Sequence, residues 1–143
     1  MKRKAILVYL LLVLVLTSCA GVSDWSYKLP NNYEVWRINS NEIIVKYAGD
    51  ETVNAEIPSF VKEFAYDDRY VCTRNIKSID ENNIFSEEYY ILDTEEQKLY
   101  GPYATQAEFE SVIEKMKISL VKWYRTSPDP NMEDDSKKTV SRQ

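Results

Sequence analysis

Histidine is absent from this sequence, and cysteine, glycine and proline are scarce: the 143 residues include two Cys, three Gly and five Pro. Without imidazole groups, the chain lacks the side chain that most often acts as a general base or metal ligand near neutral pH. Three scattered glycines cannot form the glycine-rich loops that hold nucleotide phosphates. The sequence also contains no Gly-x-Ser-x-Gly nucleophile motif and no calcium-loop spacing of acidic residues. We therefore expect no metal site, no cofactor and no enzymatic activity.

The first residues have the pattern of an export signal. Residues 2–4 are Lys-Arg-Lys, and an unbroken apolar run follows over residues 5–16. This run is shorter than the ~20 residues that a helix needs to span a bilayer, and its flanks match a secretory signal peptide. Leu16-Thr17-Ser18-Cys19 comes directly after the run and resembles the lipobox of bacterial lipoproteins. The resemblance implies that residues 1–18 are a signal peptide, cleaved between Ser18 and Cys19, and that the Cys19 sulfur is acylated. An ordinary signal peptide with a cysteine nearby by chance is the alternative.

A lipid on Cys19 would anchor the mature chain to the extracytoplasmic face of a bacterial membrane. A single acyl chain binds membranes reversibly, whereas two or more chains anchor a protein stably. Loss of the signal peptide leaves 15 Lys+Arg against 23 Asp+Glu, so the net charge changes from −5 to −8. That charge argues against nucleic acid as a partner and against electrostatic adhesion to anionic headgroups. It favours solubility, with a basic partner as the alternative.

Most of the remaining chain has the composition of antiparallel strands. Short runs rich in aromatic and β-branched residues are separated by polar turn clusters. We predict hairpins in which residues 39–41, 67–68 and 94–97 form the turns. Asp67-Asp68 is therefore interpreted as a turn rather than as a metal or catalytic carboxylate pair. The expected strands cover residues 33–38, 42–47, 61–66, 69–74, 88–93 and 98–103.

A helix is expected after the last strand. Thr105 and Glu108 have the spacing of a capping box, with Thr105 as the N-cap residue. Apolar residues then follow at i, i+3, i+4 and i+7 and continue for two further turns. The pattern predicts a helix from Gln106 to about Tyr124, with its apolar face packed on the sheet. That face consists of Phe109, Val112, Ile113, Met116, Leu120 and Trp123.

These elements predict one small α+β domain over residues 33–125: an antiparallel sheet of five or six strands in hairpins, with one C-terminal amphipathic helix packed on one face. Residues 19–32 are expected to be a tether from the lipidated cysteine, in which Trp25 and Tyr27 either fold back onto the domain or lie at the headgroup level. Residues 126–143 are polar, and we expect a disordered tail. Cys72 lies in a predicted strand and is expected to be a buried, inert thiol.

Two stretches carry a family resemblance. The first contains Leu29-Pro30-Asn31-Asn32-Tyr33 and Trp36-Arg37-Ile38-Asn39-Ser40. The second contains Tyr89-Tyr90-Ile91-Leu92-Asp93 and Leu99-Tyr100-Gly101-Pro102-Tyr103, followed by the capped helix. In these stretches the chain is similar to small uncharacterised lipoproteins of Gram-positive bacteria, which are grouped as a domain of unknown function. The resemblance implies an envelope location and a fold type, but no activity and no functional residues.

Aromatic residues are the one compositional excess, with 11 Tyr, three Trp and four Phe. A single helix covers only one face of a sheet, so the other face could bind a partner through aromatic side chains. The alternative explanation is that tyrosine packs well on half-exposed strands. Adjacent Tyr89 and Tyr90 should lie on opposite faces. The candidate binding face consists of Trp36, Tyr89, Tyr90, Tyr100 and Tyr103.

The leading functional hypothesis is a non-enzymatic, membrane-anchored envelope module that binds another envelope protein or a wall polysaccharide. The alternative is a carboxylate-dependent hydrolase or inhibitor that acts on cell-wall material, since paired carboxylates meet in space rather than in sequence. A third hypothesis is a structural spacer with no specific ligand, which predicts a surface without a pocket or an aromatic patch.

Overall fold

The computed structural model describes residues 25–49, 52–53, 55–79 and 84–127. The expected signal peptide, Cys19 and residues 128–143 of the expected tail lie outside the described residues. Within the described part of the chain, no helix has the length and apolar character needed to cross a bilayer.

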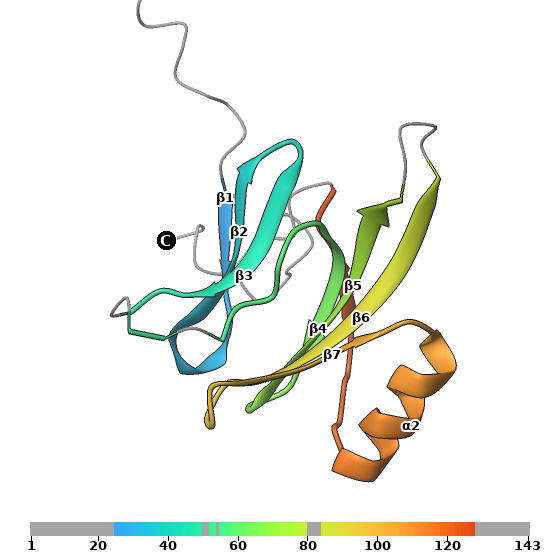
Figure 1. Cartoon of the computed structure of the whole chain (residues 1–143). Coiled ribbons are helices and arrows are strands. Elements are labelled where there is room, and N and C mark those ends of the chain that lie inside the picture. The colour runs from blue at the N-terminus through green and yellow to red at the C-terminus, as the bar shows by residue number, and fades with distance from the viewer. Residues whose placement is uncertain (1–24, 50–51, 54, 80–83, 128–143) are drawn as a thin grey trace, which may run out of the picture.

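Two antiparallel sheets make up most of the described fold. Sheet A has the strand order β1-β2-β3, and sheet B has the order β7-β6-β5-β4-β8. Figure 1 shows sheet A on one side of sheet B and the helix α2 on the other, so the predicted α+β class is confirmed. The elements are β1 (Trp25–Lys28), the short 3-10 turn η1 (Pro30–Asn32), β2 (Tyr33–Asn39), β3 (Glu42–Tyr47), β4 (Val61–Tyr66), β5 (Tyr70–Ser78), β6 (Phe85–Asp93), β7 (Lys98–Tyr103), α2 (Gln106–Met116) and β8 (Trp123–Arg125).

The three predicted hairpins are present, and polar side chains stabilise their turns. In the β4–β5 turn, Asp67 Oδ1 accepts hydrogen bonds from the backbone N–H groups of Arg69 at 2.9 Å and Tyr70 at 2.6 Å. This geometry confirms that Asp67-Asp68 is a turn. In the β2–β3 turn, Asn39 Oδ1 accepts a hydrogen bond from the N–H of Asn41 at 2.8 Å. These local bonds explain why short-range sequence patterns located the hairpins.

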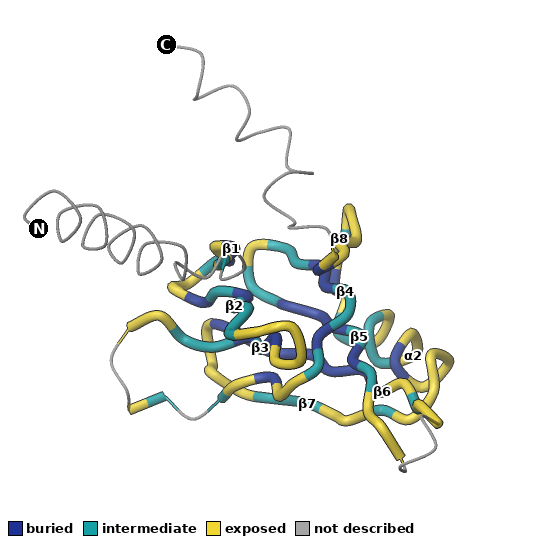
Figure 2. Tube along the Cα trace, turned by 90° about the horizontal axis from the view of Figure 1, so that it is seen from above, coloured by how far each residue is buried: buried dark blue, intermediate teal, exposed yellow. Residues whose placement is uncertain are grey.

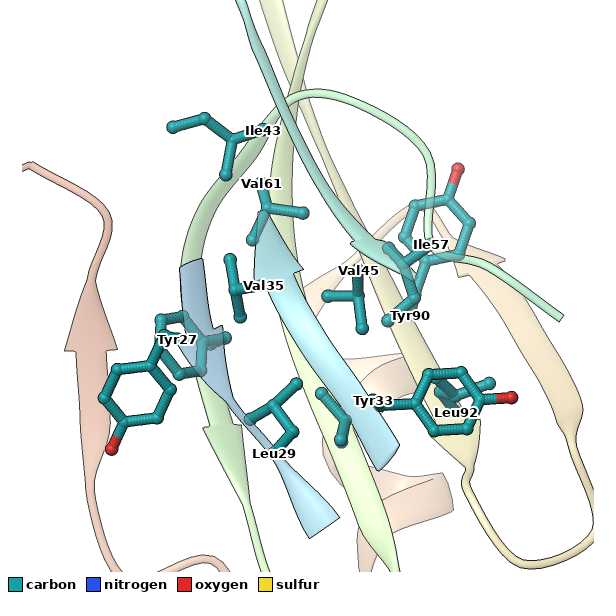
Figure 3. Close-up of a cluster of buried hydrophobic side chains, with 12 residues drawn as sticks. Tyr27, Leu29, Tyr33, Val35, Ile43, Val45, Ile57, Val61, Tyr90 and Leu92 are labelled. Carbon is teal, nitrogen blue, oxygen red and sulfur yellow. The ribbon is translucent and has the colours of Figure 1, made fainter. Parts of the chain in front are cut away.

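The main core lies between the two sheets. Tyr27, Val35 and Val45 from sheet A meet Phe64 and Leu92 from sheet B, and all five are completely buried. Figure 3 shows how the labelled side chains of this cluster come together from both sheets. In Figure 2, the buried segments of the central strands gather in the same region. The expectation that one face of the larger sheet stays open is therefore wrong, because sheet A covers it.

A second core lies between sheet B and α2. Thr105 Oγ1 accepts a hydrogen bond from the backbone N–H of Glu108 at 3.2 Å, which confirms the predicted N-cap. Phe109 is the one residue of α2 that is buried. It stacks on Tyr89 with a centroid distance of 5.2 Å. The buried members of this cluster are Cys72, Tyr89, Ile91, Phe109 and Ile118.

The helix ends earlier than the sequence predicts. Lys117 follows Met116 with a φ of 56°, a left-handed conformation that terminates helices. The backbone N–H groups of Lys117 and Ile118 then bond to the carbonyl oxygens of Glu114 and Ile113 at 3.1 Å each. The expectation of a helix to about Tyr124 is therefore wrong.

The segment after α2 is extended and ends in β8, which pairs with β4 through Glu63↔Arg125, Phe64↔Tyr124 and Ala65↔Trp123. Residues 118, 120, 124 and 126 are less exposed than their immediate neighbours, which is the period of a strand. Pairing with β8 satisfies the backbone groups on an edge of β4 that would otherwise be unpaired. The stability gained from this pairing depends on the tertiary fold, and it outweighs the helix-forming tendency of residues 117–124.

Both predicted ends of the domain need correction. Residues 25–28, which were expected within the tether, form β1, and Tyr27 is completely buried. Of the two alternatives for Tyr27, folding back onto the domain is correct. At the other end, Thr126 was expected in the tail but is 3% exposed, and its Oγ1 donates to the carbonyl oxygens of Val61 and Lys62, each 3.0 Å away. The folded region therefore includes both residues.

An ion pair joins two turns at one end of sheet B. Arg69 Nη2 lies 2.6 Å from Asp93 Oδ2, and Arg69 Nε lies 3.1 and 3.0 Å from the two Asp93 oxygens. Asp93 is 1% exposed, and its Oδ1 also accepts the N–H groups of Glu95 and Glu96. Burial opposes ionisation of this carboxyl, but the hydrogen bonds from Arg69 and the backbone outweigh burial, so the pKa of Asp93 is lowered.

Replacement of Tyr27 by alanine tests whether β1 is part of the core. We expect Tyr27→Ala to lower the free energy of unfolding by about 3–5 kcal/mol, because it leaves a cavity between the sheets. The control is Lys28→Ala, an exposed neighbour in the same strand, which should stay within about 0.5 kcal/mol of wild type. Urea unfolding followed by tryptophan fluorescence measures both variants. Equal stabilities would place β1 outside the core.

Replacement of Asp93 by asparagine tests the ion pair. At neutral pH we expect a loss of about 2 kcal/mol in the free energy of unfolding, because an amide cannot replace a buried carboxylate that accepts hydrogen bonds from Arg69 Nε and Nη2 and from the backbone N–H groups of Glu95 and Glu96. Since the folded-state pKa is lowered, the carboxylate contributes its stability above the unfolded pKa of about 4 and loses it as the pH falls through the folded pKa. The stability gap between wild type and variant should therefore narrow in acid. A pH series of urea unfolding curves measures the gap, and a constant gap contradicts the assignment.

Candidate functional site

The five aromatic residues predicted as a binding face do not share one face. Tyr89 and Tyr90 lie on opposite sides of sheet B, as alternation predicts, and each is only 6% exposed. Tyr90 packs between the sheets, where burial and the hydrogen bond from its Oη to Glu88 raise its pKa to about 12. Tyr100 and Tyr103 are half-buried near Tyr89 on the α2 side.

Trp36 lies on the outer face of sheet A, because its neighbour Val35 points into the core and alternate residues of a strand point in opposite directions. Lys46 Nζ lies 3.1 Å from the centroid of the Trp36 ring and 3.9 Å from Glu34 Oε1. A cation from the chain itself therefore covers one face of this ring. Packing explains Trp36 and the tyrosines better than a shared open surface.

A different site opens on the α2 side of sheet B. In Figure 1, the far ends of β5 and β6 extend beyond α2, so the helix leaves part of this face uncovered. A groove of about 340 Å³ lies there, between α2, the segment leading into β8, and the floor of the sheet. We call it the α2–β8 groove. Its lining residues are Glu63, Arg74, Tyr89, Gln106, Phe109, Glu110, Ile113, Leu120 and Trp123.

One part of the groove is apolar and centred on two aromatic rings. Trp123 packs edge-to-face on Phe109, with the ring centroids 6.2 Å apart. Phe109 is buried, whereas Trp123 is 40% exposed. Ile113 and Leu120 are half-buried and complete the apolar wall. A large, partly exposed indole beside aliphatic side chains is a common anchor for ligands.

The other part of the groove is ionic. Arg74 on β5 donates from Nη1 to Glu63 Oε2 at 2.9 Å and from Nη2 to Glu87 Oε1 at 2.5 Å. Arg125 Nε on β8 lies 3.7 Å from Glu63 Oε1. These four residues form a row of alternating charge across four neighbouring strands, an arrangement that stabilises antiparallel pairing. On the helix side of the groove, Gln106 Nε2 donates a hydrogen bond to Glu110 Oε1 at 2.6 Å.

In the part of the chain that the structure describes, two carboxyl groups, those of Glu87 and Asp93, have shifted pKa values, and both pKa values are lowered. The hydrogen bond from Arg74 lowers the pKa of Glu87, burial opposes the change, and a hydrogen bond from Tyr89 adds to the lowering. The pKa of Asp93 is also lowered. A general acid of a hydrolase needs the opposite shift, which keeps its proton near neutral pH. These two carboxylates are suited to ion pairing. Among the described residues, no three Asp, Glu or Cys side chains are grouped so as to hold a metal ion.

Comparison with protein families matches residues 30–124 to a family described as "Protein of unknown function (DUF3997)". The chain belongs to this family. The match covers more than half of the 143 residues. It leaves out β1 but includes β2 to β7, α2 and every residue that lines the α2–β8 groove. No curated protein and no solved structure matches the chain. The sequence resemblance to a domain of unknown function is therefore confirmed.

Apart from Leu29, the two stretches that carried the resemblance lie within the DUF3997 match, and the structure shows what they do. Tyr89 to Asp93 belong to β6 and are all buried, and Leu99 to Tyr103 form most of β7 beside it. Pro30 to Asn32 form the turn η1 that joins β1 to β2. These residues build the fold, and Tyr89 also lines the α2–β8 groove.

Cys72 of the DUF3997 domain is a free thiol that is completely buried, as expected. Burial raises the pKa of this thiol, and the charge of Asp67 adds to the rise. The thiolate is the reactive form, so we expect Cys72 to be unreactive in the folded protein.

Sequence reasoning did not predict the α2–β8 groove, because it placed Leu120 and Trp123 on a continuous helix. On that helix both side chains would face the sheet and leave no opening beside α2. The alternation of Ile118, Leu120, Tyr124 and Thr126 was the available signal, and it competes with an equally regular helical pattern.

The burial of Cys72 can be tested with a thiol reagent. In a Cys19→Ser variant, Cys72 is the only cysteine. We expect Ellman's reagent to modify it at least about a hundred times more slowly in buffer than in 6 M guanidinium chloride, because burial blocks access and disfavours the thiolate. Rapid modification of the native protein would contradict the placement of β5.

Proposed function

We propose that this chain is a lipid-anchored, non-enzymatic binding module at the extracytoplasmic face of a bacterial membrane, and that the α2–β8 groove is its binding site. The observation that carries the proposal is the groove itself. Its volume of about 340 Å³ lies within the range of ligand sites, and it combines an apolar wall with a few polar groups.

The anchor in this proposal rests on the N-terminal sequence. A basic start, an apolar run over residues 5–16 and Leu16-Thr17-Ser18-Cys19 together support export, cleavage and acylation of Cys19. Trp25, where β1 begins, follows Cys19 by six residues. Six residues of extended chain reach at most about 20 Å. The anchored domain would therefore stay close to the membrane and meet partners there.

A binding role accounts for the charged and aromatic lining better than catalysis does. The sequence contains no histidine, and the carboxyl groups with shifted pKa values, Glu87 and Asp93, hold their protons less tightly than usual. The Trp123 ring is partly exposed. A partly exposed aromatic ring in a groove is expected of a binding protein and is not expected of a structural spacer. The proposed partners are another envelope protein or a wall polysaccharide.

Site-specific crosslinking in cells tests the proposal. A photoreactive amino acid at Gln106, on the exposed rim of the groove, should capture a specific envelope component that mass spectrometry identifies. The matched control carries the same group at Lys28, an exposed position on sheet A, and should not capture that component. In a Cys19→Ala background the protein should leave the membrane fraction and the capture should be lost, because the lipid supplies the local concentration.

Two results contradict the proposal. If positions 106 and 28 yield the same products or no specific product, the groove is not the binding site. If Cys19→Ala protein remains in the membrane fraction with its signal peptide processed normally, Cys19 is not the anchor.

A further inference from the structure

The charges around the α2–β8 groove point to the chemistry of its ligand. The lining includes two carboxylates, Glu63 and Glu110, and one guanidinium, Arg74. Arg74 is already held by two partners, since it bonds Glu63 on one side and Glu87 on the other. The groove therefore presents more negative than positive charge to a ligand. The mature chain as a whole is also acidic, with a net charge of −8.

Glu63 has one oxygen that is firmly bound and one that is loosely held. Oε2 accepts the 2.9 Å hydrogen bond from Arg74, whereas Oε1 is 3.7 Å from Arg125 Nε, which is beyond hydrogen-bond distance. The Arg125 side chain is 74% exposed, and exposed ion pairs of this kind contribute little stability. An incoming cation could therefore replace Arg125 at Glu63 Oε1 at little cost.

The apolar part of the groove suits the stem of a cationic side chain. Trp123 is 40% exposed and stands beside Phe109 and Leu120. Indole faces attract ammonium groups, and the methylenes of lysine pack on apolar surfaces while the charge stays in a polar region. The protein makes this contact elsewhere with its own residues, since Lys46 Nζ lies over the Trp36 ring.

We propose that the α2–β8 groove binds a lysine-type side chain from a basic peptide segment of an envelope partner, with the ammonium group at Glu63 and Glu110 and the aliphatic stem along Trp123 and Leu120. This inference rests on the proposed function, because it takes the groove as the binding site. A groove of about 340 Å³ accommodates one long side chain rather than a folded element.

Titration with small probes tests the ligand chemistry. The mature Cys19→Ser protein is followed by ¹H–¹⁵N spectra, with the Trp123 indole and the Gln106 side-chain amide as reporters. The probes are Nα-acetyl-lysine methylamide, the norleucine analogue that lacks the charge, the glutamate analogue, and N-acetylglucosamine. We expect the lysine probe to shift both reporters and the norleucine probe to bind about fivefold more weakly, because a partly exposed ion pair has that magnitude.

For three variants we predict the direction in which the affinity for the lysine probe changes. Glu110→Gln should weaken binding about threefold, because it removes one carboxylate. Arg125→Ala should strengthen binding by a similar factor, because it removes the cation that competes at Glu63. Glu108→Gln is the matched control, an exposed carboxylate on the same helix that does not line the groove, and it should leave the affinity unchanged.

Several outcomes overturn the inference. These are equal binding of the lysine and norleucine probes, preferred binding of N-acetylglucosamine or the glutamate analogue, no shift with any probe, and weaker lysine binding in Arg125→Ala. Capture of a partner at position 106 in cells, combined with any of these outcomes, would leave the proposed function standing and reject only the cationic ligand. Absence of specific capture at position 106 would reject the proposed function itself.

Discussion

Sheet B is apolar on both of its faces, and the rest of the fold follows from the need to cover both. Val71 and Cys72 are adjacent in β5, and Ile91 and Leu92 are adjacent in β6, yet all four are completely buried. Because adjacent strand residues point to opposite faces, a single covering layer would leave half of these side chains in water. Sheet A covers one face, and α2 with the segment that follows it covers the other.

α2 and the segment that follows it cover only part of their face of sheet B, and the α2–β8 groove lies in the part that they leave uncovered. α2 has 11 residues, of which only Phe109 is buried. Beyond its reach, the sheet carries charged side chains in place of apolar ones, and Arg74 bonds two carboxylates across neighbouring strands. The α2–β8 groove lies where the apolar and ionic parts of this face meet. Most aromatic residues serve the two cores, so an exposed ring such as Trp123 is the exception.

Local patterns located much of this fold in advance. Turn residues such as Asp67 and Asn39 bond to the backbone within a few residues, so they fix hairpins without help from the rest of the chain. The Thr105 N-cap acts over three residues in the same way. The assignment of one open sheet face was wrong, although the run Tyr89 to Leu92 is the pattern of a strand buried on both faces. The assignment of residues 25–28 to a tether was wrong because β1 is short and lies beside the polar residues of a linker.

The sequence by itself determined the three hairpins and their turns, the start of α2, the acidic charge and the pattern of an export signal, because each depends on composition or on neighbours within a few residues. Only the tertiary structure decided that sheet A closes one face of sheet B, that α2 stops at Met116, and that Trp123 lines a groove. Residues 117–125 match a helix and a strand about equally well. β4 lies about 60 residues earlier in the chain and has a free edge. Pairing with that edge makes the strand β8 more stable than a continued helix.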